Sequence, residues 1–149
     1  MDGFEALEAV GKGDQFTIWR MPSLVAMQVV GSIDDTGSEH WQAALTREFA
    51  ARGYPRFYAM DVSKVDASLS IAGRYRTVDF VRRTLHKVEW ATLLARGSPG
   101  PVLVVRAMLR VVSMPNITLC VNERVFRQQV DAMRSGEVPP MARERSWWR

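Results

Sequence analysis

Serines and aspartates concentrate in one short stretch of the chain, directly after an apolar run that ends at residue 60. The stretch contains Asp61, Ser63, Asp66, Ser68 and Ser70. Hydroxyl and carboxylate groups at the start of a helix accept hydrogen bonds from its free amides, and a phosphate added there would bring nearly two negative charges. Ser68 and Ser70 are therefore candidate phosphoacceptors, and the other three are candidates for contact with a partner. The alternative is that Asp66 or Ser68 only caps the helix.

Basic side chains follow this stretch, on the next two helices that the sequence predicts. They are Arg74, Arg82, Arg83, His86, Lys87, Arg106 and Arg110. If the two helices are neighbours, the arginines form one basic surface that suits an acidic protein partner, because charge governs encounter rate and specificity. The alternative is an ordinary solvated helix face. We expect no nucleic-acid binding, because known reader motifs are missing and Asp79 and Glu89 lie nearby.

Residue types needed for catalysis or metal binding do not cluster in the sequence. His40 and His86 are the only histidines, and the single cysteine, Cys120, lies inside an apolar run, which is typical of a buried thiol. Phosphate-binding, dinucleotide-binding and nucleophile-elbow motifs are absent. We therefore expect a protein that is not an enzyme and holds neither cofactor nor metal. Four aspartates at expected strand ends are more typical of caps and turns than of a hydrolase, namely Asp34, Asp35, Asp61 and Asp66.

The 149 residues are enough for one domain with its own core. The net charge of +4 comes from interspersed groups, so it indicates a mildly basic solvated surface. The N-terminal residues lack the apolar segment of a signal peptide, and no run reaches the ~18 apolar residues of a membrane span. With its single cysteine, the chain is expected in a reducing cytoplasm.

We place one domain at residues 1–138 and a tail at residues 139–149. The tail is basic and ends in Trp147, Trp148 and Arg149. The two tryptophans either fold back on the domain or anchor a partner, because tryptophan is frequent at binding hot spots.

Apolar periodicity predicts strands that alternate with helices. Strands are expected over residues 4–10, 15–20, 24–30, 56–62, 89–95 and 117–121, and helices over residues 36–52, 69–88, 102–112 and 123–135. Thr36 and Glu39 have the spacing of a capping box, Asn122 is placed to cap the last helix, and Gly53 and Gly136 are placed to end helices. This alternation predicts an α/β fold, with a mixed sheet of about four to six strands, parallel in its interior, and about four helices.

The second helix has one apolar stripe, which we expect to face the sheet. Burial of its larger members would contribute about 1.5–3 kcal/mol each, which exceeds an exposed ion pair. The stripe consists of Ile71, Ala72, Tyr75, Val78, Val81, Leu85 and Val88.

Residues 24–34, followed by the helix with Trp41 and Phe49, resemble the "strand, Gly-x-Ile/Leu-Asp, helix" opening of STAS domains. That family is named for sulfate transporters and anti-sigma factor antagonists. Residues 60–65, Met-Asp-Val-Ser-Lys-Val, are similar to its Leu-Asp-Leu-Ser-x-Val strand. The order of the remaining elements also fits, so the resemblance covers residues 15–136. It implies a STAS-like, SpoIIAA-like domain of the bacterial cytoplasm that binds a protein such as a kinase or a sigma regulator.

The chain departs from the family at the start of the second helix. Anti-sigma antagonists of this family carry Asp-Ser-Ser-Gly-Leu there, and a kinase phosphorylates the second serine. If Asp66 is matched to the aspartate, Ser68 takes the phosphoserine position. If the strand is extended without a gap, Ser70 matches the first serine and Ile71 takes that position. In both alignments the glycine after the serines is missing, so the phosphorylation switch does not carry over directly.

The residues and the resemblance together predict a non-catalytic, protein-binding regulatory module. Its docking surface would combine the 63–70 loop with the second and third helices. One alternative is an adaptor or structural subunit, which forms a homo-oligomer or joins a larger bacterial assembly through the tail tryptophans and a sheet edge. A third is a carrier of a small molecule or lipid, with a pocket among the helices.

Overall fold

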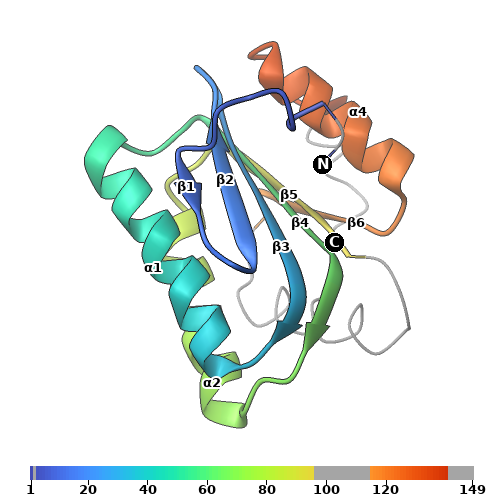
Figure 1. Ribbon diagram of the computed structural model, residues 1–149. Helices are drawn as coiled ribbons and strands as arrows, with labels where there is room; N and C mark the ends of the chain where they lie inside the picture. Colours follow the sequence, from blue (N-terminus) through green and yellow to red (C-terminus); the bar gives the residue numbers. More distant parts are fainter. Residues whose placement is uncertain (2, 96–114, 141–149) are drawn as a thin grey trace.

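The computed structural model describes residues 1, 3–95 and 115–140. Within them a six-stranded sheet has the order β1-β2-β3-β4-β5-β6. The strands are β1 (Gly11–Lys12), β2 (Phe16–Arg20), β3 (Leu24–Ile33), β4 (Phe57–Ala67), β5 (Trp90–Leu94) and β6 (Ile117–Cys120). The helices are α1 (Asp35–Arg52), α2 (Ile71–Leu85) and α4 (Glu123–Arg134) (Figure 1). This mixed α/β architecture confirms the predicted fold class, with three described helices where about four were expected. The helix predicted over residues 102–112 lies outside the described residues.

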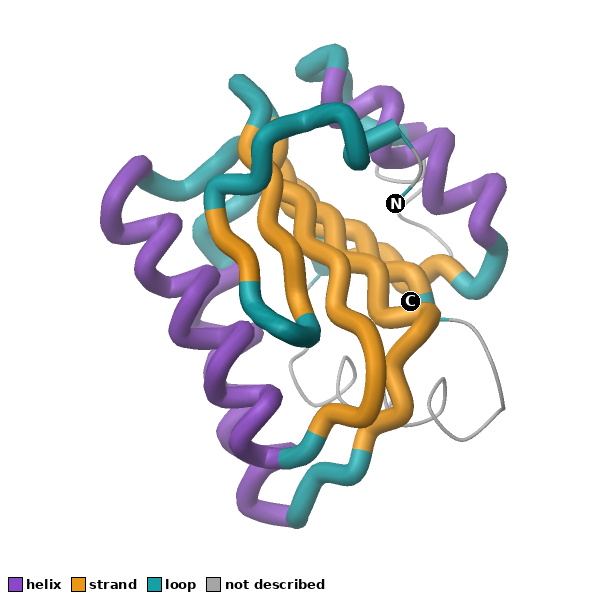
Figure 2. Tube along the Cα trace, in the orientation of Figure 1, coloured by secondary structure: helices purple, strands orange, loops and turns teal. Residues whose placement is uncertain are grey.

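The directions of the strands explain which face each helix covers. β3, β4, β5 and β6 run parallel to one another, whereas β1 and β2 pair antiparallel with their neighbours. Parallel neighbours need crossover connections, and right-handed crossovers that step in one direction place their helices on one face of the sheet. Accordingly, α1 and α2 lie side by side on one face, and α4 lies on the other (Figures 1 and 2).

The sheet separates two apolar clusters, and the side chains of its central strands alternate between them. In β3, Val25 and Met27 belong to the cluster under α1 and α2, whereas Leu24 and Ala26 belong to the cluster under α4. All four side chains are fully buried. Burial on both faces explains why this strand is a continuous apolar run in the sequence.

Residues 4–10 do not form the strand that the sequence predicts. Pairing with β2 begins where the Val10 amide donates to the Ile18 carbonyl at 2.9 Å, and β1 occupies two residues of the segment predicted to be a turn. Phe4 is instead buried in the cluster under α4, where its ring centroid lies 5.5 Å from that of Trp19. The apolar residues that suggested a strand therefore serve packing against a face of the sheet.

Helix α1 begins one residue earlier than predicted and uses a different cap. The N-cap is Asp34, whose Oδ1 accepts a hydrogen bond from the Gly37 amide at 2.8 Å. The predicted capping box at Thr36 is therefore wrong, because Thr36 already lies inside the helix. The end of α1 confirms the prediction: Gly53 has a φ of 84° and donates its amide to the Phe49 carbonyl.

β3 and β4 continue well past their predicted ends. Residues 64–67 of β4 pair with residues 30–33 of β3, and the Ser68 amide donates to the Ile33 carbonyl at 2.8 Å. The pairing of β4 with β5 stops at Asp61, so beyond it β3 and β4 form a two-stranded ribbon (Figure 2). The predicted 63–70 loop is therefore wrong for most of its length, and only residues 68–70 connect β4 to α2.

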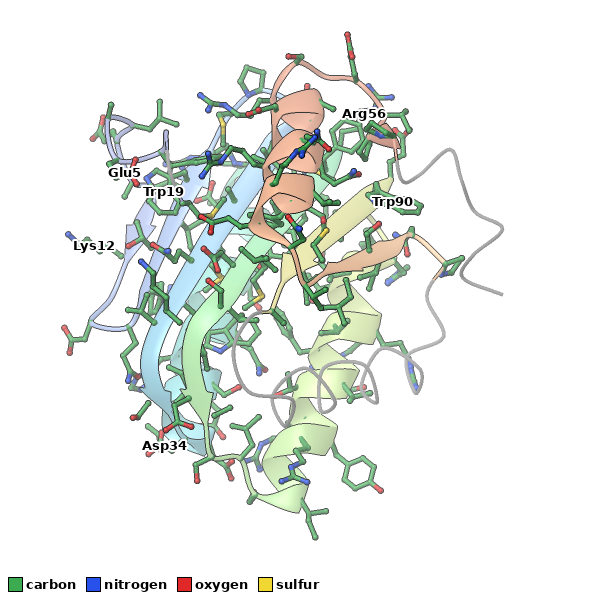
Figure 3. The ribbon with its side chains drawn as sticks, turned by 90° about the vertical axis from the view of Figure 1, so that its right-hand side faces the viewer. Glu5, Lys12, Trp19, Asp34, Arg56 and Trp90 are labelled. Atoms are coloured by element: carbon green, nitrogen blue, oxygen red, sulfur yellow. The ribbon has the colours of Figure 1, made fainter. Side chains whose placement is uncertain are left out.

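Helix α2 turns a different face to the core than the predicted stripe. Ile71 and Tyr75 are 72% and 70% exposed, because the first turn of α2 lies beyond the end of the sheet (Figure 3). The prediction was right for Val78, Leu85 and Val88, which are buried. Smaller or polar residues complete the buried face, namely Gly73, Thr77 and Thr84, together with Phe80. Phe80 packs edge-on against Trp41 of α1.

Candidate functional site

The predicted site residues lie on two sides of the sheet. Asp61 and Ser63 line a recess beside α4. Ser70 and Arg74 lie at the start of α2, which covers the opposite face (Figure 1). The segment 61–70 therefore does not form one surface. Four further predicted partner residues lie outside the described residues: Arg106, Arg110, Trp147 and Trp148.

Asp61 is buried, and its carboxylate stabilises a β-bulge in β4. Between the pairs that β3 forms at Gln28 and Val30, β4 has one residue more than its partner. The Asp61 Oδ1 accepts from the Ser63 amide at 2.9 Å and from its hydroxyl at 2.6 Å, and Oδ2 accepts from the Gln28 amide group at 3.3 Å. A bulge leaves polar backbone groups without hydrogen-bond partners in the neighbouring strand. The Asp61 carboxylate is the partner of one of them, the Ser63 amide. The Asp-x-Ser signature of the strand thus has a structural role here.

The recess beside Asp61 is small. It has a volume of about 90 Å³ and is closed on the helix side by Phe126 and Arg127 of α4. Pockets for small-molecule ligands usually measure about 300–1,000 Å³. Its size fits a few water molecules better than a carried lipid or metabolite.

A larger hollow of about 550 Å³ is an open groove between the β1–β2 turn and α1. Its lining mixes apolar and polar groups, the latter including Asp14, His40 and Arg47. In the part of the chain that the structure describes, no three metal-binding side chains lie together. Burial raises the pKa of the Cys120 thiol, which places it among inert cysteines.

Ser70 is the cap of α2 and bonds to the first residue of α1. Its Oγ accepts a hydrogen bond from the Gly73 amide at 3.0 Å, so the predicted caps Asp66 and Ser68 are wrong. The Ser70 amide donates to the Asp35 Oδ1 at 2.9 Å, and the Ser70 hydroxyl donates to the Asp35 Oδ2. Residues 35 positions apart in the sequence are thereby joined at one corner of the molecule.

Asp35 is the residue of this corner whose role the sequence did not reveal. The Ser70 hydroxyl, followed by the Ser70 amide, holds the pKa of the Asp35 carboxyl below its ordinary value, and Arg76 acts in the same direction. The Arg76 Nη2 lies 3.4 Å from the Asp35 Oδ2. The available signal was the pair of consecutive aspartates at 34 and 35: Asp34 caps α1, and Asp35 reaches α2. Figure 3 shows Asp34 at the end of β3, near the start of α2.

A second set of polar contacts fixes α2 against α1 one turn further on. The Ser38 and Thr77 hydroxyl oxygens lie 3.3 Å apart, and the Gln42 side-chain amide donates to both, at 2.8 and 3.1 Å. Ser38 and Thr77 are buried. Paired buried polar groups of this kind specify one arrangement of neighbouring elements, so the start of α2 has a defined position.

The exposed residues at this end of α2 form an apolar patch with an arginine beside it. Ile71, Arg74 and Tyr75 have the spacing of neighbours on one helix face, and all three are exposed. The guanidinium of Arg74 makes no hydrogen bond or ion pair to any residue that the structure describes. We call these three residues and Ser70 the α2 corner.

The other predicted arginines of α2 are not equivalent. Arg82 lies seven residues after Tyr75 and therefore on the same side of the helix. Arg83 lies about 100° further around the helix and pairs with Asp79 at 2.9 Å. Of the basic residues expected on α2, Arg82 thus lies on the side of the α2 corner, and Arg83 does not.

Comparison with known proteins connects this chain to others by its fold and not by its sequence. No protein-family model matches the chain, and no curated protein matches it. No helix within the described ranges is both long enough and apolar enough to cross a bilayer.

Solved structures give clear matches. The unphosphorylated anti-sigma factor antagonist SpoIIAA matches with a TM-score of 0.56 and 12% identity, over 80% of this chain and 97% of that one. An anti-sigma factor antagonist from Mycobacterium paratuberculosis matches with a TM-score of 0.53 and 16% identity, over 82% and 99%. An uncharacterized protein from Shewanella loihica matches with a TM-score of 0.52 and 14% identity, over 73% and 86%. The chain therefore has the SpoIIAA-like, STAS-like fold that its sequence resembles.

Proposed function

We propose that this protein is a non-catalytic regulatory module of the bacterial cytoplasm that docks an acidic protein partner through the α2 corner. The observation that carries the proposal is the exposure of Ile71 and Tyr75, at 72% and 70%, on one face of α2. Two large apolar side chains placed one turn apart in solvent are typical of a binding surface. The core of the domain gains nothing from them.

The composition of the α2 corner favours a protein partner. Tyrosine and arginine are the residue types most often found at binding hot spots, and here Tyr75 and Arg74 are adjacent. Arg74 adds positive charge beside the apolar pair, which would steer an acidic partner and orient it. The proposed docking surface is smaller than the one expected from the sequence, because Asp61 and Ser63 do not belong to it.

The fold supports the regulatory class. Two of the structural matches are described as anti-sigma factor antagonists, and SpoIIAA is also known in a phosphorylated form that matches with a TM-score of 0.51. We therefore propose a partner of the kinase or sigma-regulator type. Ser70 is the candidate phosphoacceptor that the geometry favours, because it stands at the start of α2. Ser68 lies in the preceding connection.

The test begins with the partner that the wild-type chain captures from its native cells, identified by mass spectrometry. Binding of that purified partner is then measured for Tyr75→Asp and Arg74→Glu. We expect each change to weaken binding about 30-fold or more, as truncation of a hot-spot residue does, with a melting temperature near that of the wild type.

Leu7→Asp is the matched control, because Leu7 is also an exposed apolar residue but lies in the N-terminal segment, away from α2. This variant should bind the partner normally. Wild-type affinity in both α2 variants, or an equal loss in the Leu7 variant, would remove the α2 corner as the docking site.

A further inference from the structure

Residues 3–9 cover part of the α4 face of the sheet without belonging to the sheet. Figure 1 shows this segment crossing from β1 towards α4. Its backbone hydrogen bonds are local: the Phe4 amide donates to the Met1 carbonyl, and the Leu7 amide donates to the Phe4 carbonyl. Pairing with β2 begins only at Val10. Among the residues that the structure describes, no backbone group of this segment bonds to the domain beyond the first ten residues.

One buried side chain fastens this segment, which we call the strap. Phe4 is 2% exposed, whereas residues 3 and 5–8 are exposed. The centroid of the Phe4 ring lies 5.5 Å from that of Trp19 and 5.0 Å from the Arg134 guanidinium. Segments with few buried contacts and few backbone hydrogen bonds to their support open at a lower free energy than the whole domain. The strap can therefore leave the sheet while the domain stays folded.

The surface under the strap is apolar and adjoins the recess at Asp61. Trp19 and Leu24 are buried in the same cluster as Phe4. Phe4 also lines the recess, together with Phe126 of α4 and Asp61. Release of the strap would thus join the recess to the space that the Phe4 ring now fills. The two together form a groove on the α4 face.

We infer that the strap is autoinhibitory, in that Phe4 occupies a slot for an aromatic side chain of a partner protein, and binding of that partner displaces residues 3–9. The slot suits an aromatic ring because it offers an indole and a guanidinium, which form aromatic and cation–π contacts. Trp19 and Arg134 supply these groups. Tryptophan and arginine are also frequent at binding hot spots.

Arg134 favours an acidic residue beside that aromatic side chain. Its Nη1 lies 3.5 Å from the position of a Cβ atom placed on Gly3, so the guanidinium runs along the strap backbone. The Glu5 carboxylate bonds instead to the Gly3 amide, at 2.9 Å. Within the described ranges, Arg134 contacts the Phe4 ring and no carboxylate. A partner segment with an acidic residue next to its aromatic residue would gain an ion pair that the strap lacks.

The slot is a second interaction surface. It lies on the α4 face of the sheet, whereas the α2 corner belongs to a helix on the opposite face (Figure 1). Its test therefore needs no partner of the α2 corner.

The test supplies the strap as a separate peptide to the full chain. The probe is a labelled peptide of residues 3–10, Gly-Phe-Glu-Ala-Leu-Glu-Ala-Val, and its control is the same peptide with Phe4→Ala. Binding is measured by fluorescence polarisation for the wild-type protein and for its Phe4→Ala variant. We expect the variant to bind the probe about tenfold more tightly or better, because its slot is not occupied. The control peptide should bind neither protein.

A third peptide tests the preference for an acidic neighbour. It carries Gly3→Asp, which places a carboxylate beside Arg134, and aspartate tolerates the φ of 86° at residue 3 better than most residues do. This peptide should bind the Phe4→Ala protein about threefold more tightly than the probe does, as an exposed ion pair allows. Adding Arg134→Gln to the protein should remove the gain. A gain that survives this change, or no gain, would contradict the role of Arg134.

Leu7→Ala is the matched protein control, because Leu7 is an exposed apolar residue of the same strap. It should bind the probe as the wild type does. Equal affinity of the wild type and Phe4→Ala for the probe, or equal binding of the probe and the control peptide, would overturn the inference. If Phe4→Ala does not fold, Phe4→Leu decides, since it keeps an apolar anchor without the ring: tighter probe binding than in the wild type supports displacement, and unchanged binding contradicts it. Either result leaves the docking proposal for the α2 corner standing.

Discussion

The chain uses the same arrangement of groups twice, once inside the sheet and once at the α2 corner. In both places one carboxylate accepts the amide and the hydroxyl of the same serine: Asp61 binds Ser63, and Asp35 binds Ser70. The first pair is two residues apart and partly buried, whereas the second is 35 residues apart and exposed to solvent. The contact that shapes a strand is local, and the contact that joins two helices is not.

The difference in burial predicts different roles for the Asp61–Ser63 pair and the Asp35–Ser70 pair. Asp61 is 6% exposed, so its hydrogen bonds to Ser63 and Gln28 are largely shielded from solvent. Around Asp35, water and Arg76 can solvate whatever group remains. We expect the buried pair to dominate stability and the exposed pair to govern how α1 meets α2.

The largest expected effect comes from Asp61→Ala, which removes the acceptor of the Ser63 and Gln28 donors at the bulge. Loss of these hydrogen bonds to a buried, charged acceptor predicts a loss of about 3 kcal/mol in the free energy of unfolding, measured in urea. Asp66→Ala, at an exposed position on the same strand, should change stability by less than about 0.5 kcal/mol. Similar losses at the two positions would mean that the bulge does not depend on the carboxylate.

A smaller effect is expected at the exposed corner from Gly73→Ala. Alanine is the better helix former by about 1 kcal/mol, so in open space this change would stabilise α2. Because the new Cβ would overlap the Asp35 carboxylate, that side chain must swing aside and give up its hydrogen bonds to Ser70, so we expect a net loss of about 1 kcal/mol. Adding Asp35→Ala should restore stability. Stabilisation by Gly73→Ala alone would show that the carboxylate does not rest on the helix.

The smallest expected effect is the pH dependence of the Asp35 contact. The folded-state pKa of Asp35 lies below its ordinary value of 3.8, so its contribution to stability is complete above that value and is lost as the pH falls through the folded pKa. The charged group that faces Asp35 from α2 is Arg76. The stability difference between wild type and Asp35→Asn should therefore persist from pH 7 down to about pH 4 and shrink only as the pH falls further. A difference independent of pH would contradict an ionised Asp35.

Much of the fold could be predicted because its signals are local. Continuous apolar runs marked the central strands, and Gly53 and Asn122 marked helix ends by conformational and capping preferences that neighbouring residues do not alter. The alternation of strands and helices then restricted the topology, since parallel neighbours require crossovers. These elements were right to within a few residues.

The candidate site could be predicted only in part because its contacts are long-range. Ser63, Lys64 and Asp66 suggested a loop, but pairing with the end of β3 makes this segment a strand. Ile71 and Tyr75 suggested a core face, but the sheet does not reach them. The partner of Ser70 is set by the approach of two helices, which no spacing in the sequence records. Asp35 could be recognised as a residue near a helix start but not as the acceptor of hydrogen bonds from Ser70, the cap of another helix.

The two-stranded ribbon at the end of β3 and β4 has a consequence for how this protein can diverge. Beyond Asp61 the ribbon carries the starts of α1 and α2 away from the main sheet. Substitutions at the exposed residues Ile71, Arg74 and Tyr75 therefore leave the packing of the sheet untouched, and changes of specificity can accumulate there without loss of the scaffold. Descendants of one such gene could acquire different binding preferences while keeping the same body.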